Sequence, residues 1–346
     1  MSDVRARSGS TDIPLAVVTG ASAGVGRATA VAFARRGRRV ALLARGHAGL
    51  AGAGRDVEAA GGWPVVIPVD VADADAVFAA AAQLVARWGR LDVWVNNAMA
   101  TVFGPADRVP TEEWRRVTEV TYLGSVHGTL AALRHMRAVN RGTIVQVGSA
   151  LAYRSIPLQA PYCAAKAALR GFTDSLRCEL LHDRSQVRLT MVHLPGVNTP
   201  QFGWSRTHMA CRHKPVGAVY QPEPIAEAIV NAALNAPREL WVGAPAVQAI
   251  LGEMIAPGLL DRYLARTAYE AQISSEPAGD GGGILEVPAE RDHGAHGRFD
   301  ATAKRRVASA SAALVRGGTA LAAVGVLAGL FAVARRRSDG VPATRP

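Results

Sequence analysis

Cysteine is scarce in this chain, where only Cys163, Cys178 and Cys211 occur among 346 residues. Their separations match neither the paired spacing of a zinc site nor the framework of a disulfide-stapled domain. We expect the three cysteines to be buried and to pack as small hydrophobic side chains. The sequence therefore predicts no metal centre, and its sparing use of cysteine suits a cytoplasmic catalytic domain in a reducing compartment.

Acidic residues are outnumbered, with 28 against 39 lysines and arginines, so the formal net charge is +11. From Arg291 onward ten basic residues face three aspartates, and most of the excess therefore lies in the C-terminal tail. Positively charged grooves that bind single-stranded nucleic acid interleave aromatic side chains with their lysines and arginines. The basic C-terminal tail has no such interleaved aromatic residues. We expect no nucleic-acid partner.

An apolar stretch is missing from residues 1–14, "MSDVRARSGSTDIP", which argues against a secretory signal. These residues are predicted to be a disordered lead-in. Hydrophobic residues nevertheless make up 49% of the chain, which is ample for a large core.

Short β-rich runs alternate with alanine-rich helical runs from Leu15 onward. Apolar strands with little alternation, each followed by a helix, indicate a parallel sheet that is buried on both faces. The sequence thus predicts an α/β doubly wound parallel sheet, a Rossmann fold, in one catalytic domain over 15–270. The expected strands are 15–19, 40–44, 65–69, 92–96, 143–149, 187–194 and 239–243, and the expected helices are 25–36, 50–60, 74–88, 111–136, 162–181 and 224–236.

The periodic pattern ends near Tyr269, and residues 271–316 are predicted to be a linker. Residues 317–334 then run without a charge between Arg316 and the basic tail 335–346. Eighteen apolar residues are the lower limit for a membrane span, so this segment is predicted as a transmembrane or membrane-associated helix. A buried terminal helix and a disordered tail are the alternatives.

A glycine-rich turn, "TGASAGVG", follows the first strand and opens the first helix with Gly20, Gly24 and Gly26. Such a turn lets backbone N–H groups approach a pyrophosphate, although a tight βα turn needs glycine in any case. No acid that could bind the ribose of NAD occurs between Gly26 and Asp56, and Arg45 ends the second strand. A guanidinium pairs with a phosphate, so we expect NADP(H), the alternative being a solvated arginine.

Tyr162 and Lys166 lie four residues apart in an alanine-rich helix. This spacing stacks the two side chains on one helix face, where a nearby ammonium stabilises a phenolate. The alternative is a packed tyrosine ring beside a lysine that reaches water.

Together these motifs make residues 15–242 resemble the classical short-chain dehydrogenase/reductase family. The resemblance rests on the glycine turn, on Asp70-Val71, on "NNAMA", on Ser149 thirteen residues before Tyr162, and on Pro195-Gly196. It implies catalysis by Ser149, Tyr162 and Lys166, with Tyr162 as general acid/base. It also implies a small-molecule carbonyl or alcohol substrate and a homo-oligomer built on helices 111–136 and 162–181. The residues it assigns to the cofactor are Gly20, Ser22, Gly24, Val25, Gly26, Arg45, Asp70, Val71, Asn97, Ala98, Tyr162, Lys166, Pro195, Gly196 and Thr199.

Two departures from the family pattern concern the site. Thr121 stands where the family has an asparagine that holds a water in its proton relay, and Met99 replaces a glycine beside the nicotinamide pocket. Phe202 and Trp204 fall in the segment that closes over substrate in the family, which indicates a hydrophobic substrate or a loop packed by its own aromatics.

These expectations add up to an NADP(H)-dependent oxidoreductase that interconverts a ketone and a secondary alcohol on a lipophilic small molecule. A membrane-associated NADP(H)-binding sensor or scaffold with little catalysis is the alternative that Thr121 and Met99 keep open. The substrate, the direction of the reaction and the oligomeric state do not follow from the sequence.

Overall fold

Eight strands form the central sheet of the computed structural model, which describes residues 13–278, 283–319 and 321. Seven strands are parallel, and the edge strand β14 is antiparallel to β12. Their order across the sheet is β14 (Ser309–Ser311), β12 (Glu239–Val242), β7 (Val187–Leu194), β6 (Gly142–Ser149), β4 (Val93–Asn96), β1 (Leu15–Thr19), β2 (Arg39–Ala44) and β3 (Trp63–Pro68).

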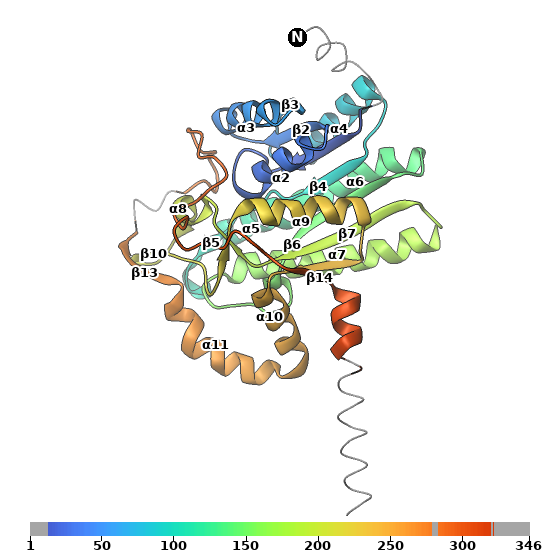
Figure 1. Cartoon of the computed structure of the whole chain (residues 1–346). Helices are drawn as coiled ribbons and strands as arrows, with labels where there is room; N and C mark the ends of the chain where they lie inside the picture. Colours follow the sequence, from blue (N-terminus) through green and yellow to red (C-terminus); the bar gives the residue numbers. More distant parts are fainter. Residues whose placement is uncertain (1–12, 279–282, 320, 322–346) are drawn as a thin grey trace, which may run out of the picture.

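Helices cover both faces of this sheet (Figure 1). On one face α2 (Gly24–Ala34), α3 (His47–Ala59) and α9 (Pro222–Asn235) share a buried core with the strands. On the other face α4 (Ala74–Trp88), α6 (Gly124–Ala138) and α7 (Ala160–His182) share a second core. Alternate residues of one strand enter opposite cores, as Leu15 and Ala16 do, which explains why the strands are apolar without alternation. The Rossmann-like fold is confirmed.

The predicted helix 111–136 is interrupted in the structure. It consists of α5 (Thr111–Thr118), a π-helical turn η2 (Glu119–Leu123) and α6. Gly124 follows this turn at a tight crossing, because a Cβ there would lie 2.6 Å from a methyl of Val71. The wider turn lets the chain pass this crossing while Thr121 bonds the loop after β4.

Short elements surround the carboxyl edge of the sheet. The pairs β5 (Val102–Phe103) with β9 (Arg206–Thr207), β8 (Gly196–Val197) with β11 (Val219–Tyr220), and β10 (Cys211–His213) with β13 (Ile273–Pro277) form three small sheets. The remaining elements are η1 (Ala106–Arg108), η3 (Ala150–Ala152), α8 (Gln201–Trp204), α10 (Ala244–Ile255) and α11 (Pro257–Ala271).

The described part of the predicted linker 271–316 packs on the catalytic domain, and its strand β14 joins the central sheet. Leu285 is 2% exposed, and β14 extends the sheet beside β12. Residues 312–319 are helical, and the described part of the chain contains no helix long and apolar enough to cross a membrane. The apolar helix predicted over 317–334 and the basic tail lie almost wholly outside the described residues, as does the lead-in up to residue 12.

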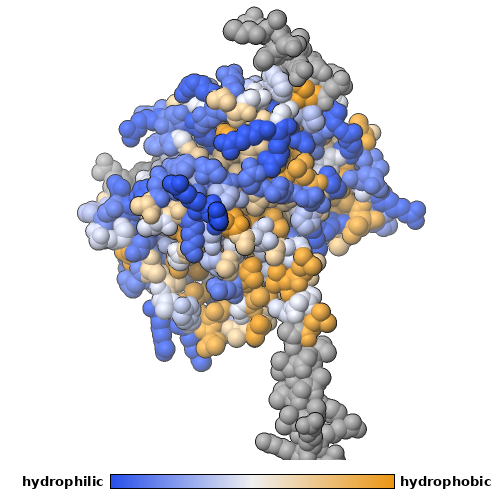
Figure 2. All heavy atoms as spheres, viewed as in Figure 1, coloured by the Kyte–Doolittle hydropathy of each residue, from blue (hydrophilic) through white to orange (hydrophobic). Residues whose placement is uncertain are grey.

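Exposed apolar side chains gather at one end of the molecule. Figure 2 shows this surface around α10, beside the point where the described chain ends. Met254, Ile255 and Leu259 at the α10–α11 junction are 48%, 77% and 68% exposed, and Leu314 of the terminal helical residues is 75% exposed.

Candidate functional site

A cavity of about 600 Å³ opens at the carboxyl ends of β1, β4, β6 and β7. This edge holds the point where the strand order reverses between β1 and β4, the usual ligand position in an open α/β sheet. All the predicted site residues except Gly26 and Thr121 line it, namely Gly20, Ser22, Gly24, Val25, Arg45, Asp70, Val71, Asn97, Ala98, Met99, Ser149, Tyr162, Lys166, Pro195, Gly196, Thr199, Phe202 and Trp204.

The glycines of the first turn are required by close contacts. Gly20 has φ +66°, and a Cβ on it would lie 2.8 Å from Cα of Ala98. A Cβ on Gly26 would lie 2.2 Å from the carbonyl oxygen of Gly20, so Gly26 serves the packing of α2 rather than the cavity wall. The turn thus brings backbone and the N-terminus of α2 to the cavity, a cradle that fits a pyrophosphate.

Asn97 ties the ends of β4 and β1 together. Its side-chain amide donates to the carbonyl oxygen of Thr19 at 2.9 Å, and its backbone N–H donates to Thr19 Oγ1 at 3.0 Å. Ala98 N–H donates to the same hydroxyl at 3.1 Å. Thr19 therefore positions this edge of the cavity, although the sequence reasoning did not single it out.

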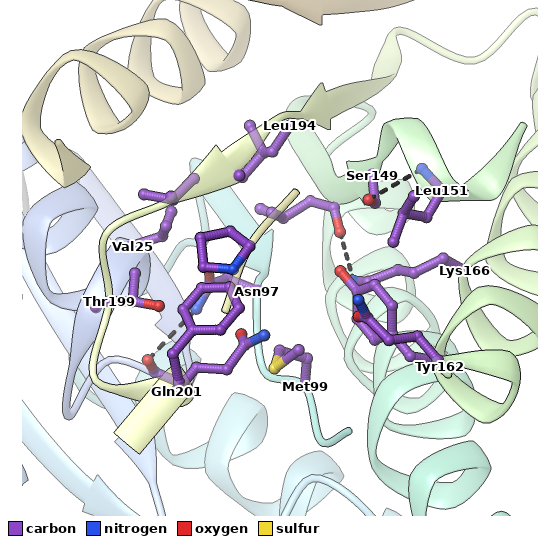
Figure 3. A pocket seen from close by; sticks show the side chains of 18 of the residues that line it. Val25, Asn97, Met99, Ser149, Leu151, Tyr162, Lys166, Leu194, Thr199 and Gln201 are labelled. Carbon is purple, nitrogen blue, oxygen red and sulfur yellow. Dashed lines mark hydrogen bonds between the residues drawn. The ribbon is translucent and has the colours of Figure 1, made fainter. Parts of the chain in front are cut away.

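Tyr162, Lys166 and Ser149 meet on one wall, opposite Val25 and Thr199 (Figure 3). Lys166 lies 2% exposed on α7, and its Nζ donates to the carbonyl oxygen of Val147 at 2.7 Å. The same Nζ lies 5.7 Å from the centre of the Tyr162 ring. Ser149 ends β6, where its Oγ accepts from Leu151 N–H at 3.1 Å.

Burial dominates the titration of this pair. It raises the pKa of Tyr162 above its ordinary value, and a hydrogen bond with Ser149 opposes the shift. It also lowers the pKa of Lys166 from 10.5 to about 8. Desolvation disfavours a charge on either group, so in the protein alone the phenol is held protonated rather than brought toward neutral pH.

The other end of the cavity carries the predicted cofactor cation, Arg45. Its guanidinium donates to the carbonyl oxygens of Ile284, Leu285 and Glu286 at 2.6, 3.2 and 2.8 Å. It also lies 3.9 Å from the Asp70 carboxylate.

Asp70 is held ionised beside Arg45. Burial acts to raise its pKa, but a hydrogen bond from Ala72 N–H and the Arg116 guanidinium keep that pKa below its ordinary value. The Ala72 bond is 3.0 Å long. Both carboxylate oxygens of Asp70 are therefore engaged by the protein.

Thr121 does not reach the cavity. Its hydroxyl donates to the carbonyl oxygen of Ala100 and accepts from Ala100 N–H, both at 2.9 Å, and its side chain is fully buried. The interaction that the structure provides for it is therefore the support of the loop after β4, which carries Met99 to the cavity wall.

The wall around Tyr162 is mostly apolar, although Arg154, Gln159 and Gln248 also line the cavity, and its apolar side chains come from elements that the sequence reasoning missed. Leu151 and Ile156 follow β6, whereas Leu260, Tyr263 and Leu264 come from α11. Their sequence signal was the apolar repeat of "PGLLDRYLARTA", which the prediction left unassigned within the domain. Phe202 lines the cavity but is 7% exposed and packs against Phe103, Phe299 and His213.

Residues 14–209 match the sequence profile of the family described as short chain dehydrogenase. The uncharacterized oxidoreductase YxnA of Bacillus subtilis is 33% identical over 76% of this chain and 74% of that protein.

Two solved structures are similar over most of the domain. A metagenomic short-chain oxidoreductase in complex with NADP has a TM-score of 0.55 and 31% identity, covering 65% of this chain and 91% of that one. An alcohol dehydrogenase from the archaeon Thermococcus sibiricus, complexed with 5-hydroxy-NADP, has a TM-score of 0.58 and 28% identity over 66% of this chain and 96% of that one.

Proposed function

The chain belongs to the short-chain dehydrogenase family, and from this premise we propose that it is an NADP(H)-dependent oxidoreductase that interconverts a ketone and a secondary alcohol on a lipophilic small molecule. One observation carries the proposal. Tyr162, Lys166 and Ser149 lie in one cavity where its glycine-lined half meets its apolar half.

The glycine-lined half fits a dinucleotide. A Cβ on Gly20 would collide with Ala98 and one on Gly24 would crowd Thr199, so glycine at these positions lets the turn bring backbone and the start of α2 to the cavity, as a pyrophosphate site requires. No acid that could bind a ribose hydroxyl stands at the end of β2, whereas Arg45 adds positive charge there. This charge, together with the NADP and 5-hydroxy-NADP of the two similar structures, supports NADP(H) over NAD(H).

The reaction needs a proton at the substrate oxygen. When bound, NADP(H) supplies or accepts the hydride at the substrate carbon. In reduction Tyr162 Oη gives its proton to the carbonyl oxygen, and in oxidation the phenolate takes that proton back. Ser149 donates to the same oxygen as its charge develops, and the Lys166 ammonium stabilises the phenolate that Tyr162 leaves behind.

The apolar half supports a lipophilic substrate. Met99, Leu151 and Ile156 line the cavity with the α11 side chains Leu260 and Leu264. Such a wall desolvates hydrocarbon and leaves few polar groups to orient a small hydrophilic carbonyl. The substrate class we propose is therefore a ketone or secondary alcohol carried on a large apolar skeleton.

Replacing Tyr162 tests the proposal. The purified protein should oxidise NADPH with a panel of apolar ketones, and Tyr162→Phe should lower kcat by about 10²- to 10⁴-fold, the usual contribution of a general acid. NADPH binding, followed by its fluorescence, should survive in the variant. Tyr269→Phe, a change at an exposed tyrosine of α11, is the matched control. Full turnover by Tyr162→Phe would exclude the assigned role, and tight NADPH binding without turnover on any carbonyl would favour a sensor.

A further inference from the structure

Ser149 begins a short segment, residues 149–153, at the carboxyl end of β6. Ser149, Ala150 and Leu151 line the cavity, and Tyr153 follows the turn η3. The Ser149 hydroxyl accepts from Leu151 N–H at 3.1 Å (Figure 3), and its own proton is left for an oxygen in the cavity. The direction in which Ser149 donates therefore depends on how firmly this segment is held.

A buried histidine holds the first end of the segment. His193 of β7 is 0% exposed, and its Nδ1 lies 3.0 Å from the main-chain carbonyl oxygen of Ser149. A carbonyl oxygen only accepts hydrogen bonds, so Nδ1 carries the proton of this contact. A Cβ on Gly148 would lie 3.0 Å from Nδ1. Glycine at position 148 thus makes room for the imidazole to reach Ser149 from the neighbouring strand.

The carboxylate of Glu239, on β12, holds the other end. Tyr153 Oη donates to Glu239 Oε2 at 2.6 Å, and His193 Nε2 lies 3.6 Å from the same oxygen. The Tyr153 and His193 rings meet edge-on with their centres 5.0 Å apart. One carboxylate oxygen therefore faces both ends of the segment, directly through Tyr153 and by way of the imidazole for Ser149.

Glu239 is a buried charge that its surroundings keep ionised. Its side chain is 2% exposed, Arg238 donates to Oε1 at 2.7 Å, and Arg316 Nη2 from the C-terminal segment lies 3.5 Å from Oε2. Burial acts to raise the pKa of Glu239, but the hydrogen-bond donors around it, His193 and Tyr153 foremost, hold that pKa well below its usual range. The carboxylate is therefore a fixed acceptor at neutral pH.

Such a network contributes more to position than to stability. Replacing a buried ion pair by apolar side chains is often neutral for stability, because the cost of desolvating the charges offsets their attraction. Polar contacts that are all satisfied, however, hold their members to one arrangement. A group that acts on reacting atoms needs that precision, since an error of about 1 Å can cost a hundredfold in rate.

We propose that His193 and Glu239 are positioning residues for Ser149. His193 holds the main-chain carbonyl of Ser149, Glu239 holds His193 and Tyr153, and together they fix the Ser149 hydroxyl beside Tyr162. The described residues that line the cavity include neither His193 nor Glu239, so both act through Ser149 rather than on substrate or cofactor. The inference rests on the proposed function, because Ser149 acts in that reaction.

Steady-state kinetics of the full chain test the assignment, with NADPH and the apolar ketone that the wild type reduces fastest. His193→Leu removes the contact with Ser149 and should lower kcat about tenfold to a hundredfold, with KM for NADPH changed less than twofold. His193→Gln keeps an N–H donor and should recover most of the lost rate. Thr190→Val is the matched control, because Thr190 is equally buried on β7 and donates to the carbonyl oxygen of Pro237. Its kcat should stay within twofold of the wild type.

The same substitutions in a Ser149→Ala chain separate positioning from general support of the fold. If His193 and Glu239 act through the Ser149 hydroxyl, His193→Leu should change the residual kcat of that chain less than twofold. Tyr153→Phe removes one hydroxyl that contacts Glu239, and it should lower kcat several-fold when Ser149 is present and hardly at all when it is absent. This milder variant also decides the matter if His193→Leu does not fold.

Two results would overturn the inference. One is an equal fold loss of kcat with and without Ser149, and the other is a wild-type kcat in both His193→Leu and Tyr153→Phe. Failure of the proposed function itself looks different. In that case the wild type reduces no ketone, or Ser149→Ala alone leaves kcat unchanged, and the inference fails with it.

Discussion

Lys166 illustrates how burial decides chemistry at the scale of one residue. The sequence pairs it with Tyr162, and the structure adds that both groups lie where charge is disfavoured. Its ammonium stabilises the phenolate of Tyr162 only while it holds a proton. With a pKa of about 8, Lys166 loses that proton above pH 8, and the proposed proton transfer should weaken there.

The same pKa shift makes a prediction for folding. Between pH 8 and 10.5 the unfolded chain holds a proton on Lys166 that the folded chain has released, so the free energy of unfolding rises with pH. The rise should be ~2 kcal/mol between pH 7.5 and 9.5, at about 1.36 kcal/mol per pH unit within that window. Urea unfolding of the wild type and of Lys166→Met over this range measures it. If the difference in free energy of unfolding between the wild type and Lys166→Met stayed constant over this pH range, it would contradict a buried Lys166 with a lowered pKa.

At the scale of elements, the π-helical turn η2 and the loop after β4 form one unit. Thr121 bonds both backbone groups of Ala100, and Gly124 lets the turn pass Val71 closely. The sequence reasoning placed Thr121 in a proton relay by analogy with an asparagine. That role stays a prediction, and the bonds observed for Thr121 support the loop that carries Met99.

A substitution of Thr121 separates these two roles. Thr121→Val keeps the shape but leaves the N–H and carbonyl of Ala100 unpaired, so unfolding should become easier by about 1–3 kcal/mol. Thr121→Ser retains the hydroxyl and should lose much less. Denaturant unfolding and steady-state kinetics on both variants supply the comparison. A Thr121→Val enzyme of normal stability whose kcat alone falls would favour the relay role over the supporting role.

At the scale of the whole molecule, the C-terminal segment completes the sheet and the cavity. The strand β14 pairs with β12, and Arg316 Nη2 donates to the hydroxyl of Tyr153 at 3.0 Å. Tyr153 in turn donates to the buried Glu239 of β12 at 2.6 Å. Residues far along the chain therefore hold the sheet edge that adjoins the site.

Two truncations test this organisation together with the membrane prediction. A chain ending at Leu321 should unfold like the full chain, whereas one ending at Ser275 loses β14 and Leu285, and its Tm should fall by roughly 10 °C, the equivalent of several kcal/mol in a domain of this size. Calorimetry gives both Tm values. Equal Tm values would contradict the structural role of the C-terminal segment.

The full chain should also sediment with anionic vesicles, whereas the chain ending at Leu321 should not. Residues 322–337 carry most of the apolar run and the arginines that follow it. A full chain left in the supernatant would contradict membrane contact.

Local patterns in the sequence were sufficient to predict the parallel strands, the glycine turn, and the helix that carries Tyr162 and Lys166. Strand burial, tight turns and i,i+4 stacking act over a few residues, so the sequence reports them directly. The α4 bounds Ala74–Trp88 agree with the prediction to the residue.

Only the tertiary structure decided the partners of Arg45, the place of Thr121, the apolar wall from α11, and the return of residues 284–293 to the cavity wall. Arg45 meets Ile284 across 239 positions of the chain, and no local periodicity encodes such a contact. The direction of the Tyr162 pKa belongs to the same class, because desolvation depends on everything that packs around the phenol.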